Sequence, residues 1–266
     1  MQIIERFITN NENYKARRTL TMKGIMIHSV GCPQPDPEVF VKIFNDSSGK
    51  PNGRQVGVHA FVGHDGRVFQ TMPWDFQAWH CGKGANGSAN STHIGIELTE
   101  PKTIKYIKGS TFQDNDPVAS KAFVEAAYKV AVELFAHLCK QYNFNPLADG
   151  VIISHAEGHR RGIASNHGDV EHLWKVYGIT MDKFRQDIKA VMDGASLANP
   201  RESTKLDSHN INSKIVQFNL LGRRVDISGT IIDGKTFAHV RPLVEGLGFD
   251  IGMKDGIIEV RERNKK

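Results

Sequence analysis

The 266-residue sequence has few cysteines and no long apolar run, and both absences limit what the protein can be. Its three cysteines, Cys32, Cys81 and Cys139, form no close pair, which argues against a disulfide framework and against a zinc site made of cysteine alone. We therefore expect reduced thiols. No apolar run approaches the roughly 18 residues that indicate a membrane span, so the sequence predicts no membrane insertion.

The N-terminus lacks the basic start and the apolar core of a secretion signal, which predicts cytoplasmic synthesis without a signal peptide. The formal net charge of +5 and the isoelectric point near 9.0 favour an acidic partner, and nucleic acid, anionic lipid and the acidic polymers of a bacterial wall all qualify. The lysines and arginines form no dense tract and are not interleaved with aromatic residues. We therefore expect no nucleic-acid partner.

Histidine is concentrated in one stretch, residues 154–174, which holds four of the 12 histidines together with several carboxylates. Imidazole nitrogen and carboxylate oxygen are ligands that zinc accepts, and a catalytic zinc takes three protein ligands and keeps its fourth position for water or substrate. The stretch therefore predicts a metal site. One segment rarely supplies all three ligands, so a second segment should contribute.

Two short apolar runs are followed by histidine. Residues 151–153 predict a buried strand that delivers His155, and residues 24–27 predict a second strand that delivers His28. On its own, a histidine at the end of a strand is more often a core or surface residue than a metal ligand. The pattern thus makes both histidines candidate metal ligands, but it does not decide between a ligand and a core or surface residue.

Helix and strand patterns alternate along the first part of the chain. Asp36–Pro37 and Asp116–Pro117 each mark the start of a helix, and Thr180 caps a later one. Asp65–Gly66 predicts a hairpin between two apolar runs, and residues 94–98 predict a strand with one carboxylate among apolar residues. These patterns predict an α/β fold with a mixed central β-sheet flanked by helices.

Composition divides the chain into three parts. Residues 1–194 hold the patterns just described and form the first domain. Residues 195–212 are rich in serine, asparagine and charge, which predicts a flexible linker. Residues 213–266 carry short alternating runs around one helical run at 240–247, which predicts a small α+β domain.

Five motifs in the first domain resemble, in their order, those of the zinc-dependent N-acetylmuramoyl-L-alanine amidases. That family shares its fold with peptidoglycan recognition proteins and includes many phage endolysins. The resemblance covers about the first 190 residues. The motifs are I-M-I-H-S-V at 25–30, V-H-A-F-V-G-H-D-G-R-V-F-Q at 58–70, A-W-H-C-G at 78–82, I-G-I-E-L at 94–98 and the segment from the histidine at 155 to D-V at 169–170.

The resemblance implies a ligand set and a general base. His28, His155 and Asp169 match the zinc ligands, and Glu97 matches the glutamate that takes a proton from the attacking water. The family often has a lysine two residues before the last ligand, where this chain has His167. The segment between the second and third ligands is also longer than the commonest pattern. His167 is therefore a reserve candidate for the third ligand, and otherwise a hydrogen-bond donor to the oxyanion.

The implied activity is hydrolysis of the amide bond between N-acetylmuramic acid and the L-alanine of the stem peptide. Zn²⁺ would be the cofactor and bacterial peptidoglycan the substrate. Trp79 and His80 would line the groove for glycan or peptide. A phage or prophage endolysin, made in the cytoplasm and acting on the wall after release, fits the absence of a signal peptide.

Three alternatives stay open at this point. A bacterial autolysin would have the same activity, and a non-catalytic peptidoglycan-binding protein would have the same fold. A metal nuclease of the His-Asn-His type is suggested only by residues 165–167 and the basic charge, and it explains neither Glu97 nor the first histidine strand.

The C-terminal residues resemble the small stalk-type domain first described at the N-terminus of copper amine oxidases. The resemblance is carried by G-R-R-V-D at 222–226, I-I-D-G-K-T-F at 231–237, V-R-P-L at 240–243 and E-G-L-G-F at 245–249. That domain occurs as an addition to bacterial wall enzymes, so copper is not implied. It suggests wall anchoring or dimerisation, with a plain spacer as the alternative.

Overall fold

The computed structural model describes residues 1–46 and 56–195 with their side chains and, further along the chain, the backbone of five strands between 213 and 262. The chain forms two compact units, Met1–Leu197 and Ala198–Lys266. The predicted linker beyond residue 195 and the predicted helix at 240–247 lie outside the described residues.

A six-stranded sheet forms the centre of the first unit, with the strand order β1-β4-β3-β5-β2-β8. Strands β3 and β4 pair antiparallel around the Asp65–Gly66 turn, and the other four neighbouring pairs are parallel. The prediction of a mixed sheet is confirmed. The strands are β1 (Gln2–Glu5), β2 (Gly24–Ser29), β3 (Ala60–Val62), β4 (Arg67–Gln70), β5 (His93–Leu98) and β8 (Ile152–Ser154).

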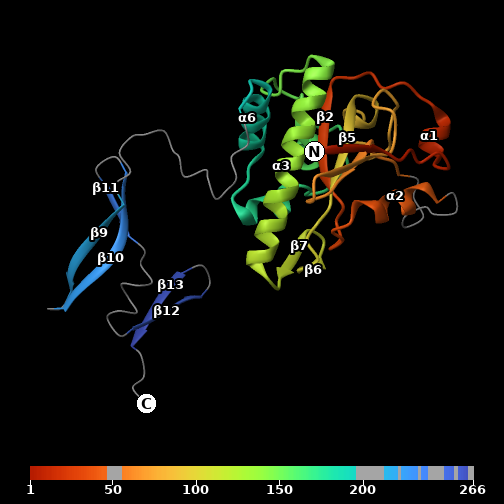
Figure 1. Cartoon of the computed structure of the whole chain (residues 1–266). Helices are drawn as coiled ribbons and strands as arrows, with labels where there is room; N and C mark the ends of the chain where they lie inside the picture. The colour runs from red at the N-terminus through yellow and green to blue at the C-terminus, as the bar shows by residue number, and fades with distance from the viewer. Residues whose placement is uncertain are drawn as a thin grey trace. The chain divides into compact units, whose positions relative to one another are not determined.

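The helices begin where the sequence predicts. The side chains of Asp36, Asp116 and Thr180 each accept a hydrogen bond from a backbone N–H of the first helical turn. Figure 1 shows the long helix α3 with α6 beside it. The helices are α1 (Glu12–Ala16), α2 (Pro37–Asn45), α3 (Pro117–Tyr142), α4 (His155–Arg160), α5 (Glu171–Trp174) and α6 (Met181–Met192), with short 3₁₀ turns at Ala89–Ser91 and Lys175–Tyr177.

The alternation of side chains along β2 separates the core from the functional face. Ile25 and Ile27 pack in the large hydrophobic cluster that includes the apolar residues of α3 and α6. Met26 and His28 must then point to the opposite face, because successive side chains of a strand alternate. Glu97 on β5 lies in register with His28. Its carboxylate therefore shares the face that α3 leaves uncovered.

One hairpin was not predicted. Strands β6 (Ile104–Lys108) and β7 (Thr111–Asp114) form a separate two-stranded antiparallel sheet. Most of their side chains are exposed or half-buried, so the segment lacks the apolar alternation that marks a core strand. Strand β1 was missed for a similar reason, since both its terminal residues are exposed.

The described part of the second unit is β-sheet. Strands β9 (Ser213–Leu220), β10 (Arg223–Ile232) and β11 (Lys235–Ala238) form an antiparallel sheet, and β12 (Phe249–Lys254) pairs with β13 (Ile257–Glu262). The alternating runs of the sequence correspond to three of these strands. Among the described helices of the whole chain, none combines the length and the apolarity that a membrane crossing requires.

Candidate metal centre and cleft

Parallel strands bring the two predicted histidines to one edge of the sheet. Strand β8 pairs with β2 through Ile25↔Ile152 and Ile27↔Ser154. His28 follows Ile27 and His155 follows Ser154, so both residues lie at the carboxyl end of their strands. Both side chains are almost fully buried. His155 is also the first residue of α4, whose capping box holds the turn in place.

Asp169 completes a compact cluster with these histidines. Its Oδ2 lies 3.0 Å from Nδ1 of His28 and 3.4 Å from Nδ1 of His155, and the two nitrogens are 3.1 Å apart. Tetrahedral ligands at zinc bond lengths of about 2.0–2.2 Å are separated by about 3.3–3.6 Å. The three atoms therefore have nearly the spacing of one face of a zinc coordination tetrahedron.

The charge states of the cluster also fit a metal. Burial lowers the pKa of His28, against the opposing effect of Asp169, and so favours the neutral imidazole. Burial alone would raise the pKa of Asp169, but the adjacent imidazoles of His155 and His28 outweigh it and the net pKa is lowered. A neutral imidazole and an ionised carboxylate are the forms that bind zinc.

Glu97 adds an unsatisfied group beside the cluster. Its Oε2 is buried and has no hydrogen-bond partner among the described residues. Burial, reinforced by the charges of Asp169 and Glu100, raises the pKa of Glu97 well above its ordinary value. A buried polar atom without a partner is costly, and a cation or an ordered water would compensate it. The donor set and the unpaired oxygen together fit a bound zinc ion.

His167 contacts the cluster from its other side. Its Nδ1 lies 3.3 Å from Nε2 of His155 and 3.1 Å from Oγ of Ser165, whereas the cluster involves Nδ1 of His155. The group of residues whose ligand atoms converge contains Asp169 and not His167. The geometry thus favours Asp169 as the third ligand and leaves His167 for a role in the cleft.

The two predicted substrate residues differ in their surroundings. Trp79 is half-buried in the cleft wall, and Arg18 lies over its ring, 5.7 Å from the centroid. His80 also borders the cleft, but its Nδ1 lies 2.8 Å from Nε2 of His28 and its Nε2 lies 3.1 Å from the carbonyl oxygen of His93. Both ring nitrogens of His80 are therefore used within the protein, which argues against the predicted role in substrate binding. The role of Trp79 stays a prediction.

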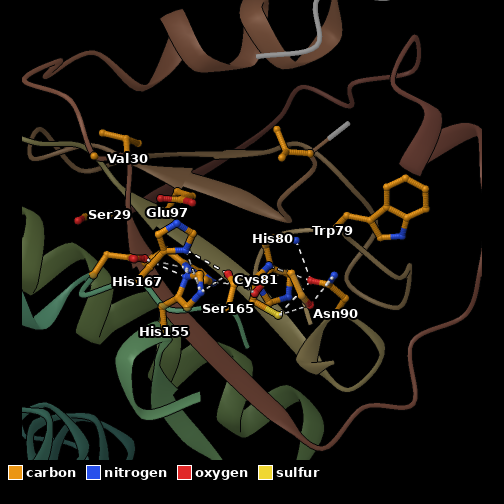
Figure 2. A pocket seen from close by; sticks show the side chains of 15 residues that line it. Ser29, Val30, Trp79, His80, Cys81, Asn90, Glu97, His155, Ser165 and His167 are labelled. Atoms are coloured by element: carbon orange, nitrogen blue, oxygen red, sulfur yellow. Dashed lines mark hydrogen bonds and ion pairs between the residues drawn. The ribbon is translucent and has the colours of Figure 1, made fainter. Parts of the chain in front are cut away.

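These residues line one cavity of about 530 Å³. Figure 2 shows His155, His167 and Ser165 gathered beside Glu97, with the indole of Trp79 at the far end of the cavity. The cavity is large enough for a disaccharide or a short peptide. The remaining lining residues are Ser29, Val30, Gly31, Val56, Cys81, Gly82 and Asn90.

A second cavity of about 450 Å³ shares His167 and Asp169 with the first and is bordered by the β6–β7 hairpin. Tyr106 donates a hydrogen bond to Oε2 of Glu100 (2.8 Å), and its hydroxyl lies 2.6 Å from Nε2 of His172. Burial raises the pKa of Glu100 to about 7. This network was not predicted, because Glu100 follows a strand and has the sequence pattern of an exposed loop residue.

His172 is buried in this network. Ser165 and Asn90 were missed as well. Asn90 accepts hydrogen bonds from the backbone N–H groups of His80 and Cys81 (both 2.9 Å) and so fixes the loop that carries His80. Single serine and asparagine residues in loops carry no recognisable pattern. Their roles become evident only from the hydrogen bonds that they make in the folded structure.

Comparison with known proteins gives a family match and a structural match. The family model described as N-acetylmuramoyl-L-alanine amidase (Amidase_2) matches residues 18–171. The N-acetylmuramoyl-L-alanine amidase CwlA of Bacillus subtilis (strain 168) is 28% identical over 126 residues, which cover 43% of this chain and 39% of CwlA. The chain thus matches well under half of the length of this curated relative.

Solved structures share the fold. The catalytic domain of XlyA has a TM-score of 0.51 at 19% identity, and the match covers 71% of this chain and 99% of that domain. The Staphylococcus aureus hydrolase AmiA has a TM-score of 0.51 at 18% identity, covering 72% of this chain and 83% of AmiA. At such identities the similarity concerns the fold alone. Because the family model spans more than half of the chain, the protein belongs to the N-acetylmuramoyl-L-alanine amidase family.

Proposed function

We propose that the protein hydrolyses the amide bond between N-acetylmuramic acid and L-alanine in peptidoglycan, with zinc as its cofactor. The observation that carries this proposal is the convergence of His28, His155 and Asp169 in the wall of a cavity that also contains the unpaired oxygen of Glu97. Family membership supports the bond and the substrate class. Zinc held by these three residues would supply Lewis-acid polarisation of the scissile carbonyl and lower the pKa of the attacking water.

Glu97 is the proposed general base and then the general acid. Its carboxylate lies opposite His28 in the sheet and opens into the same cavity. It would accept the proton of the attacking water and pass it to the leaving nitrogen of L-alanine. Such positioned proton transfer contributes about 10²–10⁴ in rate. The positive charge of a bound metal would counter the burial that otherwise favours the protonated carboxyl.

His167 is proposed to stabilise the carbonyl oxygen as it gains negative charge. It lines both cavities, between Ser165 and Asp169 in the loop that leads to α5. Its ring lies beside Ser165 and His155 at the edge of the metal cluster, where an imidazole N–H could donate a hydrogen bond to the substrate oxygen. Trp79 would hold the sugar or peptide at the far end of the cavity.

The decisive experiment incubates purified protein with purified peptidoglycan, with and without a chelator, and assays new amino termini and new reducing sugars in parallel. We expect new L-alanine amino termini, no reducing sugars, loss of activity with chelator and recovery with zinc. Wall binding with neither product would support a non-catalytic peptidoglycan-binding protein instead. A Glu97→Gln variant should lose about 10²–10⁴ in kcat and keep zinc and wall binding.

We further propose that the protein acts as an endolysin or autolysin, made in the cytoplasm and acting on the wall after release. The small C-terminal unit is proposed to anchor the enzyme to the wall or to mediate dimerisation. Sedimentation of residues 1–197 and of the full chain with and without purified walls tests both roles. Equal wall binding and a monomeric full chain would reduce the C-terminal unit to a spacer.

A further inference from the structure

The ring of His80 connects a metal-binding histidine to the backbone of the sheet. Its Nε2 lies 3.1 Å from the carbonyl oxygen of His93, and its Nδ1 lies 2.8 Å from Nε2 of His28. A carbonyl oxygen can only accept a hydrogen bond, so Nε2 of His80 carries a proton. In a neutral ring Nδ1 then has none and can only accept. His28 must therefore donate from Nε2, which leaves the lone pair of its Nδ1 directed at Asp169 and His155.

The opposite arrangement is unfavourable. If His28 carried its proton on Nδ1, His80 would have to donate from Nδ1. It would then either present the bare Nε2 lone pair to the carbonyl of His93 or carry a second proton. The first places two acceptors 3.1 Å apart, and the second charges a ring that is enclosed by other histidines.

The same reasoning applies independently to His155. Ser165 donates its hydroxyl proton to the carbonyl oxygen of Cys81 (2.9 Å). Its oxygen can then only accept at the contact with Nε2 of His155, 3.3 Å away. His155 therefore donates from Nε2 and presents the lone pair of Nδ1 to the cluster. The carbonyl oxygens of His93 and Cys81 thus determine the tautomers of His28 and His155.

Gly95 provides the space that this arrangement needs. A Cβ on Gly95 would lie 2.4 Å from Cγ and 2.8 Å from Nδ1 of the His80 ring. No side chain larger than hydrogen is compatible with the ring in this place. Glycine is therefore required at this position of the I-G-I-E-L strand, because it lets the His80 ring lie against β5 within hydrogen-bonding distance of His28.

We propose that His80 and Ser165 are positioning residues that hold His28 and His155 in the tautomer with a free Nδ1 lone pair, so that both bind zinc through Nδ1. Neither residue touches the metal in this assignment, and each acts through the ligand it contacts. Outer partners of this kind orient a ligand and commonly contribute 10–100-fold to metal affinity. The inference rests on the zinc site of the proposed function.

Ring-nitrogen NMR tests the assignment directly in the zinc-loaded, ¹⁵N-histidine-labelled full chain. We expect the proton on Nε2 in His28, His80 and His155. A proton on Nδ1 of His80, or zinc bound through Nε2 of His28, would overturn the inference. If the wild-type protein binds no zinc at all, the proposed function itself fails. The two failures are therefore distinguishable in the same sample.

Zinc affinity of variants, measured by competition with a chromophoric chelator, separates hydrogen bonding from packing. His80→Phe keeps the ring volume and removes the acceptor, so affinity should fall about 10–100-fold. His80→Asn loses volume but keeps an acceptor near the position of Nδ1, and it should bind zinc about tenfold more tightly than His80→Phe. A purely structural role for His80 would reverse that order and overturn the inference.

Two further variants complete the series. Ser165→Ala should weaken zinc binding about tenfold, because Nε2 of His155 loses the hydroxyl oxygen and keeps only its contact with Nδ1 of His167. His64→Phe is the matched control, since His64 is exposed and its ring stacks on Phe123, outside the cluster. It should bind zinc like the wild type. Thermal melting of each variant verifies folding, and the NMR result on the wild type stands if His80→Phe fails to fold.

Discussion

A single methyl group added at Gly95 on strand β5 should weaken the proposed zinc site, although Gly95 supplies no ligand. In Gly95→Ala the new Cβ would lie 2.4, 2.6 and 2.8 Å from three ring atoms of His80. Ordinary carbon contacts are about 3.5–4.0 Å, so the ring must withdraw by about 1 Å or more. The 2.8 Å hydrogen bond to His28 would then exceed hydrogen-bonding range.

The expected cost has two parts. Loss of the ligand's outer partner should reduce zinc affinity about 10–100-fold, which corresponds to about 1.4–2.7 kcal/mol of binding free energy. Overpacking should lower the free energy of unfolding of the metal-free protein by about 1–3 kcal/mol. The loss of zinc affinity depends on displacing His80 from His28, whereas the loss of stability needs only the steric overlap of the new methyl group.

A double-mutant cycle separates the two effects. Zinc affinity is measured by chelator competition, and the free energy of unfolding by denaturant titration with chelator present, for Gly95→Ala, His80→Ala and the double variant. In the His80→Ala background the methyl group has space, so Gly95→Ala should add little to either cost. Wild-type zinc affinity in Gly95→Ala would refute the reasoning, and so would full additivity of the two substitutions.

Three further predictions follow from the same site. Asp169→Asn should weaken zinc binding by more than about 100-fold in chelator competition, because an ionised ligand becomes neutral; unchanged affinity would exclude Asp169 as a ligand. Glu100 has its pKa raised from 4.5 to about 7 in the folded protein, so the folded state retains a proton that the unfolded state loses between these values. Metal-free protein should therefore be most stable below pH 4.5 with respect to this group and lose on the order of 2–3 kcal/mol of that contribution as pH rises to 7, and Glu100→Gln should flatten this slope in denaturant titrations. Trp79→Ala should raise KM for soluble wall fragments about tenfold with kcat largely retained, since it would remove binding common to ground and transition states; an unchanged KM would exclude Trp79 from substrate binding.

The sequence was sufficient to predict the strands that carry the proposed metal site. His28 and His155 each follow an apolar run that could be recognised locally, and the parallel pairing of β2 with β8 then brings them together. Helix starts were predictable for the same reason, because Asp36 and Asp116 cap helices through bonds to residues two or three positions away. Both features depend on residues only a few positions apart in the chain, so they can be recognised from the local sequence.

The partners of the ligands were not predictable. The role of His80 depends on Gly95, 15 positions along the chain, and that of Ser165 depends on a carbonyl at residue 81. Neither contact leaves a periodic or compositional sign. The buried carboxylate of Glu100 was not predictable for a related reason, since its partner Tyr106 lies on the hairpin β6–β7, which has no apolar pattern of its own.

The position of β8 at the edge of the sheet has a consequence for the order of assembly. Strands β1 to β5 all lie within the first 98 residues, whereas β8 joins β2 across more than 120 residues of chain. Contacts of such long sequence separation form late, because the entropy of closing the loop must be overcome first. His155 and Asp169 therefore arrive after the rest of the sheet can pair. During synthesis the proposed zinc site would stay incomplete until residues 152–169 have emerged, so a nascent or truncated chain would contain the first half of the fold without His155 and Asp169.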